Sequence, residues 1–240
     1  MTTAALQQEA TYLQRVYAWL TLGVTLCSGV SYVSVTLGAP VSVPTEGGSI
    51  ATVPPTVALV LQHPIATSLI FLAFALAAGV FRKSQVAGIP FFVGFTSFTG
   101  IFIGPSIYMA QMAAAKGETL TAHPVRDASL LTIFTFVGLT IYTAWSKRDF
   151  SAWGASLTTG LWVIIGASIL NIFLGSSVTD LAISSAAVVL FAGFMIYDTF
   201  NILRRPDGDH IGAALNMFLN LVNFFLHILR LFVGRGSRSD

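Results

Sequence analysis

Asp198 is the clearest candidate for chemistry in this sequence. It is the one carboxylate well inside an apolar run, which reads LFAGFMIYDTFNIL from Leu190 to Leu203. An aspartate at the centre of a membrane helix costs about 2.5–3.5 kcal/mol on insertion scales. A chain that keeps such a residue is expected to use its carboxyl group, or at least to neutralise it with a partner.

A stripe of polar residues along the last apolar segment supplies possible partners. The spacing of this stripe is 4, 3, 4 and 3, which places its members on one face of a helix. A polar stripe cannot face lipid, so it must face other helices or water. We expect it to face the preceding segment, where Asp198 and Asn201 share a face. The stripe consists of Asn216, Asn220, Asn223, His227 and Arg230.

The short link between these two segments sets the depth of Asp198. About ten residues join them, so Asp198 is expected at the level of Asn216 to Asn220. Arg82 ends the second apolar segment at a similar depth and is the best candidate counter-ion. Desolvation favours the neutral carboxyl group, whereas a nearby guanidinium favours the anion. Two interpretations stay open: a pH switch in which Arg82 moves away on protonation, and a static buried contact.

Other polar and small residues have simpler interpretations. His227 is expected to pack or to form a hydrogen bond, since no second histidine or cysteine is placed to complete a metal site. Asn171 and Asp180 are expected to cap helices. Gly100 and Gly104 lie four residues apart, a spacing that lets a neighbouring helix approach closely. The alternative for this pair, given Pro105 beside it, is a broken or kinked helix that lines a path.

The composition defines an integral membrane protein. The 240 residues are 55% hydrophobic and 9% charged, whereas soluble domains carry about 25% charged residues. The net charge of +2, without a basic block, excludes nucleic acid as a partner. The single cysteine, Cys27, excludes an intrachain disulfide. No zinc-protease or phosphate-loop motif occurs, and an aspartyl-protease site would lack its second membrane aspartate, so we expect no enzyme and no cofactor.

The hydropathy pattern predicts an all-α fold with seven transmembrane helices. Short links force antiparallel neighbours, so we expect one membrane domain over 1–240, a compact bundle around a central last helix. Residues 1–15 would be a cytosolic segment and 234–240 a tail. Residues 39–55 are expected to lack secondary structure, and 55–62 to form an interfacial helix. Basic residues at the link ends favour an inside N-terminus. The predicted spans are 16–38, 61–81, 87–112, 128–145, 151–174, 179–202 and 212–233.

The carboxy-terminal third resembles the transmembrane Bax-inhibitor-motif (Bax-inhibitor-like) family. The residues that carry the resemblance are Gly193–Ile202 and Ala214–Phe232, with weaker support from Gly100–Pro105 and Asn171–Phe173. The resemblance implies seven helices and a pH-sensitive cation leak, chiefly of Ca²⁺. It also implies a gate of two aspartates on spans six and seven with an arginine latch from span two.

The match to that gate is incomplete. Asp198 takes the position of the first aspartate and Arg82 that of the arginine, but the second aspartate is replaced by Asn220. One carboxylate with amide oxygens should bind Ca²⁺ only weakly, because a hard cation prefers several charged oxygens. Asp198 is thus a weak candidate metal ligand, and Asn201, Asn216, Asn223 and His227 would line the path.

A bacterial branch of the family offers a second function. The Gly-Pro motif of span three and the missing second aspartate are similar to this branch, which modulates a membrane-anchored protease of the FtsH type. The resemblance implies a bacterial inner membrane, membrane lipid as surroundings and a protease contact through the cytosolic amino-terminal segment. The contact residues would be Met1, Thr2, Thr3, Ala4, Ala5, Leu6, Gln7, Gln8 and Glu9.

Overall fold

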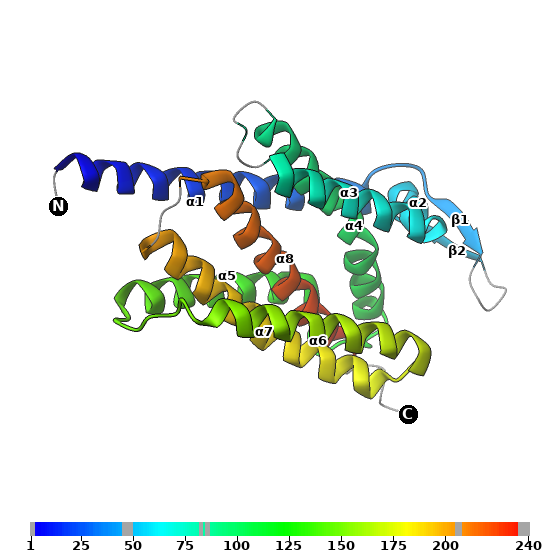
Figure 1. Cartoon of the computed structure of the whole chain (residues 1–240). Helices are drawn as coiled ribbons and strands as arrows, with labels where there is room; N and C mark the ends of the chain where they lie inside the picture. Colours follow the sequence, from blue (N-terminus) through cyan, green and yellow to red (C-terminus); the bar gives the residue numbers. More distant parts are fainter. Residues whose placement is uncertain (1–2, 45–49, 82–83, 85–86, 205–207, 235–240) are drawn as a thin grey trace. The chain divides into compact units, whose positions relative to one another are not determined.

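The computed structural model describes residues 3–44, 50–81, 84, 87–204 and 208–234 (Figure 1). This part of the chain contains eight α-helices and one two-stranded sheet. Their order and bounds are α1 Thr3–Thr36, β1 Val41–Pro44, β2 Ile50–Val53, α2 Pro55–Gln62, α3 Pro64–Phe81, α4 Gly88–Ala115, α5 Pro124–Trp145, α6 Trp153–Leu174, α7 Ser177–Arg204 and α8 His210–Gly234.

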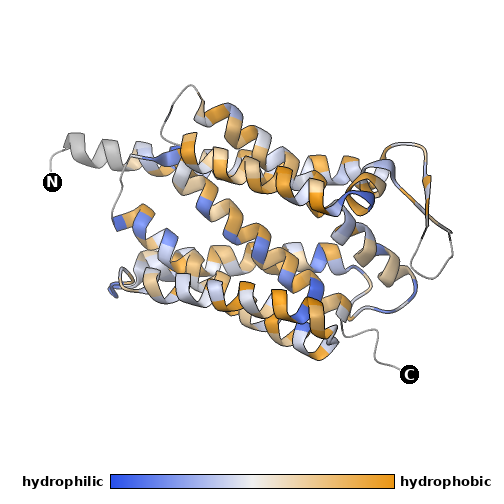
Figure 2. Cartoon of the chain, turned by 45° about the vertical axis from the view of Figure 1, so that its right-hand side comes forward, coloured by the Kyte–Doolittle hydropathy of each residue, from blue (hydrophilic) through white to orange (hydrophobic). Residues whose placement is uncertain are grey.

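Seven of these helices are long and apolar enough to cross a membrane, and α2 is the exception. The protein is therefore an all-α integral membrane protein, as predicted. The predicted spans agree with the helices to within a few residues at most ends. The largest difference is at α1, which begins at Thr3, although its candidate span begins at Ala10. Hydropathy does not register such polar first turns. Figure 2 shows hydrophobic residues along most helices and hydrophilic residues at intervals along α8.

The prediction that 39–55 lacks secondary structure is wrong. Strands β1 and β2 pair antiparallel, with Val41 opposite Val53 and Ser42 opposite Thr52. Each strand has only four residues, too few for a recognisable alternation, yet their valines favour extended backbone. Helix α2 forms as predicted and begins at Pro55, with proline in its first turn where no backbone donor is lost.

Two hydroxyl groups join α2 and the hairpin to the long helices. Thr56 of α2 donates a hydrogen bond to the carbonyl of Ser34 in α1, and Tyr108 of α4 donates one of 3.0 Å to the carbonyl of Thr52 in β2. Gly38 permits the turn after α1, because its φ of 102° suits glycine and a Cβ there would lie 2.5 Å from Pro55 Cγ.

The chain forms two compact units. The first unit contains α1 as far as Leu13, α4 from Ala110, helices α5 to α7, and α8 from Asn216. The second unit contains α1 from Gln14, the hairpin, α2, α3, α4 as far as Met109, and α8 as far as Leu215. The central position of the last helix stays a prediction.

In the second unit, the Gly-x-x-x-Gly face of α4 packs against α1, as predicted. A Cβ on Gly100 would lie 2.5 Å from the carbonyl oxygen of Cys27 and 3.0 Å from the backbone nitrogen of Ser31. A Cβ on Gly104 would lie 3.5 Å from Ser34 Cβ, an ordinary contact. Helix α4 continues through Pro105 to Ala115. The glycine pair therefore brings two backbones together without ending the helix.

In the first unit, α7 packs against α5 and α6 and forms a side-chain hydrogen bond to α8. Its contact with α6 uses two reciprocal pairs of glycine and leucine. A Cβ on Gly160 would lie 2.8 Å from a methyl group of Leu190, and a Cβ on Gly193 would lie 2.8 Å from one of Leu157. Each leucine thus fills the space above the glycine of the other helix. This close packing fixes the rotation of α7, and with it the direction of Asp198.

Candidate functional site

Asp198 lies opposite Asn220, at the depth that the short link predicts. The amide nitrogen Nδ2 of Asn220 in α8 donates a hydrogen bond of 2.6 Å to Oδ2 of Asp198 in α7. Asn220 is buried, with 7% of its surface exposed. The structure thus places the half-buried carboxyl group of Asp198 in direct contact with Asn220 of the polar stripe.

The residues beside Asp198 hold its turn of α7 against the rest of the first unit. Tyr197 lies over the start of α6, where a Cβ on Gly154 would be 2.7 Å from the tyrosine hydroxyl oxygen. Thr199 is fully buried, and its hydroxyl group has no hydrogen-bond partner. The carboxyl group therefore extends from a tightly packed turn, and its position depends on packing as well as on the hydrogen bond.

His227 contacts α7 two turns further along α8. Its ring stacks on Phe191, with centroids 5.9 Å apart and an interplanar angle of 19°. Its Nδ1 atom is buried without a hydrogen-bond partner. The histidine ring therefore packs between the two helices, and its expected position along a pore stays a prediction. The unpartnered nitrogen gives the contact between α7 and α8 a second polar atom, at a different depth from Asp198.

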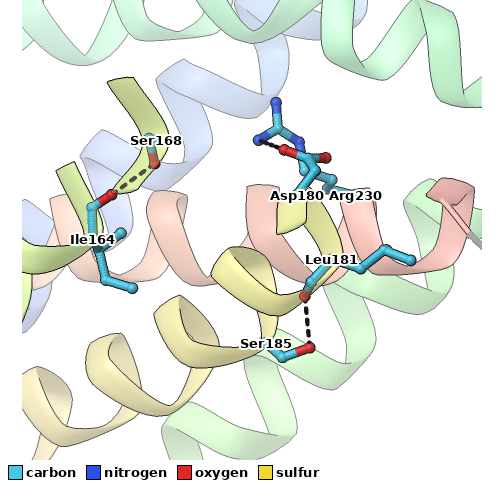
Figure 3. A network of polar contacts seen from close by, with 6 residues as sticks. All are labelled: Ile164, Ser168, Asp180, Leu181, Ser185 and Arg230. Carbon is cyan, nitrogen blue, oxygen red and sulfur yellow. Dashed lines mark hydrogen bonds and ion pairs between the residues drawn. The ribbon is translucent and has the colours of Figure 1, made fainter. Parts of the chain in front are cut away.

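Arg230 makes the third contact, and sequence reasoning missed its partner. Its Nη1 atom donates a hydrogen bond of 3.2 Å to Oδ1 of Asp180 in the first turn of α7 (Figure 3). The hydroxyl groups of Ser185 and Ser168 donate to the carbonyls of Leu181 and Ile164 in their own helices. The side chain of Asp180 therefore forms an ion pair, which the expectation of a helix cap did not include.

The three cross-helix contacts define what we name the α7–α8 seam: Asp198–Asn220, Phe191–His227 and Asp180–Arg230. The other two stripe residues do not join it. Asn216 is exposed, and Asn223 donates 2.8 Å to the carbonyl of Leu219 in its own helix. Asn201 is half-buried.

Several predicted site residues fall outside the described residues. Arg82 is one of them, so its role as the counter-ion of Asp198 stays a prediction. Met1 and Thr2 are also outside this range. Residues 3–9 form the first turns of α1, and their proposed contact with a protease stays a prediction as well.

The seam is a poor site for a resident metal ion. Among the residues that the structure describes, no group of three histidine, cysteine or acidic side chains could hold one. Asp198 brings one carboxylate, and its hydrogen bond to the Asn220 amide occupies one of its oxygens. Ca²⁺ requires six to eight oxygen ligands. The chemistry that the Asp198 carboxyl group offers at this contact is therefore the gain or loss of a proton.

Seven candidate spans, two of which meet at a half-buried carboxyl group, define a polytopic α-helical membrane protein. The chain belongs to the Bax1-I family, described as inhibitor of apoptosis-promoting Bax1, and the match covers residues 9–238. An uncharacterised membrane protein of Vibrio cholerae is 35% identical over 175 residues, which cover 73% of this chain and 74% of that one.

Two relatives of known name match a shorter part. Mouse protein lifeguard 4 is 40% identical over 108 residues, 44% of this chain and 45% of its own length. The Golgi anti-apoptotic protein of vaccinia virus, strain Lister, is 40% identical over 111 residues, 45% of this chain and 46% of its own length. These two matches span just under half of the relatives. The resemblance that the sequence indicated is confirmed at the level of the family.

Proposed function

We propose that the protein is a pH-sensitive cation leak, with Ca²⁺ as its principal ion and Asp198 as its gating carboxyl group. The observation that carries the proposal is the hydrogen bond of 2.6 Å between Asp198 and Asn220. It joins α7 to α8 through a group that can gain or lose a proton. A change at this one atom therefore alters the contact between two membrane helices.

The direction of gating follows from the strength of this bond. An amide donates more strongly to a carboxylate than to a neutral carboxyl group, so the bond is strongest when Asp198 is ionised. Protonation weakens it and adds a hydroxyl donor that needs an acceptor. We therefore expect the seam to loosen, and the leak to increase, as the pH falls. Arg82 would reinforce the ionised, closed state if it lies near Asp198.

Asn220 should temper this response. Two carboxyl groups in contact would share one proton and titrate as a coupled pair, whereas Asp198 with an amide titrates alone. The amide also contributes less than a second carboxylate to the binding of Ca²⁺. The proposal is thus a weak leak with a shallow response to pH, in a membrane where the N-terminus lies on the cytosolic side.

The test is Ca²⁺ flux into proteoliposomes at several pH values. Asp198→Asn should abolish the response to pH, and Asn220→Asp should increase Ca²⁺ flux and steepen the response. Asp127→Asn is the control, because it neutralises a carboxylate of α5 that lies outside the seam. Flux that is unchanged in Asp198→Asn contradicts the gate, and equal changes in Asp127→Asn contradict its location.

A second function is favoured by the length of α1. This helix begins at Thr3, ahead of its candidate span, which begins at Ala10. A helical extension of this kind is suited to contact another membrane protein, and we propose an FtsH-type protease in a bacterial inner membrane as that partner. Deletion of residues 2–9 leaves the span intact and should abolish co-purification with the protease. Retained co-purification would reject this function and leave the leak proposal unaffected.

A further inference from the structure

The link between α5 and α6 has a fixed conformation. Phe150 lies in the middle of this link and is 2% exposed. Its ring makes edge contacts with Trp153, at 5.0 Å between centroids, and with Phe200 of α7, at 5.9 Å. A tilted contact with Tyr142 of α5 completes the set, at 6.2 Å. One buried aromatic ring thus anchors the link to the three helices of the first unit that end beside it.

Three basic side chains gather around this anchored link. Lys147 and Arg148 belong to the link and are exposed. Arg204, at the end of α7, donates a hydrogen bond of 3.3 Å from Nη2 to the carbonyl oxygen of Ser146. Asp149 is the acidic member of the link, and its Oδ1 accepts a hydrogen bond of 2.8 Å from the backbone of Ser151. The cluster therefore presents more positive than negative charge.

Two tryptophans flank the basic cluster. Trp145 ends α5 and is 83% exposed, and Trp153 begins α6 and is 40% exposed. Tryptophan is enriched where membrane helices cross the boundary between hydrocarbon and head groups. Both rings lie at helix ends, next to cations, so the link is expected to lie at head-group depth. A binding site at this depth meets lipid before any soluble ligand.

We propose that the basic link binds the phosphate head group of an anionic phospholipid, through Lys147, Arg148 and Arg204. Guanidinium groups bind phosphate through two parallel hydrogen bonds, and basic clusters at span ends attract anionic lipids. Arg204 is oriented by Ser146, which lowers the entropy lost on binding. The exposed Trp145 ring supplies the surface along which an acyl chain packs. This inference is independent of the proposed leak.

Trp145 provides a direct reporter. In a variant with Trp19→Phe, Trp153→Phe and Trp162→Phe, Trp145 is the only tryptophan. Its fluorescence is measured in liposomes with brominated phosphatidylglycerol or with brominated phosphatidylcholine at equal mole fraction. We expect stronger quenching by the anionic lipid. Arg204→Gln should lower the affinity for the anionic lipid, relative to phosphatidylcholine, about five-fold, which is the electrostatic contribution of one basic residue near a membrane surface. The double variant Lys147→Gln with Arg148→Gln removes two such residues and should lower this relative affinity further.

A matched control distinguishes a local site from general attraction. Lys116→Gln with Arg126→Gln removes one positive charge from the link between α4 and α5 and one from the first turn of α5, and should leave the preference unchanged. Equal quenching by both lipids, or an equal loss in this control, overturns the proposal. Loss of the preference in millimolar inorganic phosphate would show a site for a free anion and overturns it as well.

A second measurement avoids the tryptophan substitutions. The otherwise unaltered protein is purified from membranes of mixed lipid, and the phospholipid that stays bound is counted by phosphorus and by head group. Arg148→Gln with Arg204→Gln should reduce the bound anionic lipid relative to the Lys116 and Arg126 control. Equal retention in the two variants contradicts the site even if the reporter variant does not fold.

Discussion

Arg230 of α8 and Asp180 of α7 form an ion pair across 50 residues of sequence, with 3.2 Å between Nη1 and Oδ1. Their side chains are 55% and 36% exposed. Together with the bond between Asp198 and Asn220, this pair joins α8 to α7 near both ends of α7. The two contacts differ in kind: one is a buried bond to an amide, and the other is a partly exposed pair of full charges.

The ion pair should contribute modestly to stability. A partly exposed pair is worth about 0–1 kcal/mol, so Asp180→Asn and Arg230→Gln should each lower the melting temperature by only a few degrees. The double variant should lose little more than either single one. Thermal unfolding in detergent measures this coupling. The exchanged pair, Asp180→Arg with Arg230→Asp, should regain part of the stability, and fully additive losses would contradict a direct interaction.

An apolar and an acidic replacement of Asn220 should differ in how the stability of the protein depends on pH. Asn220→Leu leaves the carboxyl group of Asp198 without its donor, and an unsatisfied buried polar group costs about 1–3 kcal/mol. Asn220→Asp puts two carboxyl groups in contact, so it should be less stable than wild type at neutral pH. It should recover at acid pH, where the pair shares a proton. Unfolding followed from pH 5 to pH 8 tests this, with Asn223→Leu as the control that does not contact Asp198.

The two glycines of α4 should respond differently to alanine. A Cβ at Gly100 would lie 2.5 Å from the backbone oxygen of Cys27, whereas one at Gly104 meets Ser34 at 3.5 Å. Backbone cannot move as a side chain can, so Gly100→Ala should destabilise the protein by about 1–3 kcal/mol. Gly104→Ala should be nearly neutral. Equal melting temperatures for the two variants would contradict the close packing of α1 and α4.

Gly154 connects the start of α6 to the turn that carries Asp198. Gly154→Ala would bring a methyl group against the ring of Tyr197, 2.7 Å from its hydroxyl oxygen, so it should lower stability and change the response of Ca²⁺ flux to pH. Gly166→Ala lies in the same helix with open space around it, and it should be neutral or gain up to about 1 kcal/mol from helix propensity. If both variants keep the wild-type pH response, packing does not position Asp198.

The sequence predicts the spans well because the constraint on them is severe. Every backbone polar group within the bilayer must form its hydrogen bond inside its own helix, so a long apolar run that crosses the bilayer must be helical. The hairpin of β1 and β2 was missed for the opposite reason. Its eight residues lie outside the apolar runs, and strands of four residues carry too few side chains to show a period of two.

The site was predictable where it depends on local geometry. The short link between α7 and α8 predicts Asp198 at the level of Asn216 to Asn220, and the structure shows its contact with Asn220. The pairing of Asp180 with Arg230 could not be obtained in this way. Equal counts from the link, which runs from Arg204 to His210, would place Asp180 opposite residue 234, so the actual partner depends on how the two helices cross and on the reach of an arginine.

By itself, the sequence determined that this is a seven-span membrane protein with a costly carboxyl group and a polar stripe, because hydropathy and helical period are local properties. Only the tertiary structure decided which stripe residues meet α7, that Asp180 forms an ion pair, and that Phe150 anchors a basic link beside two tryptophans. These outcomes depend on how the packed helices rotate and cross. Close contacts at glycines, between residues far apart in the sequence, determine that rotation and crossing.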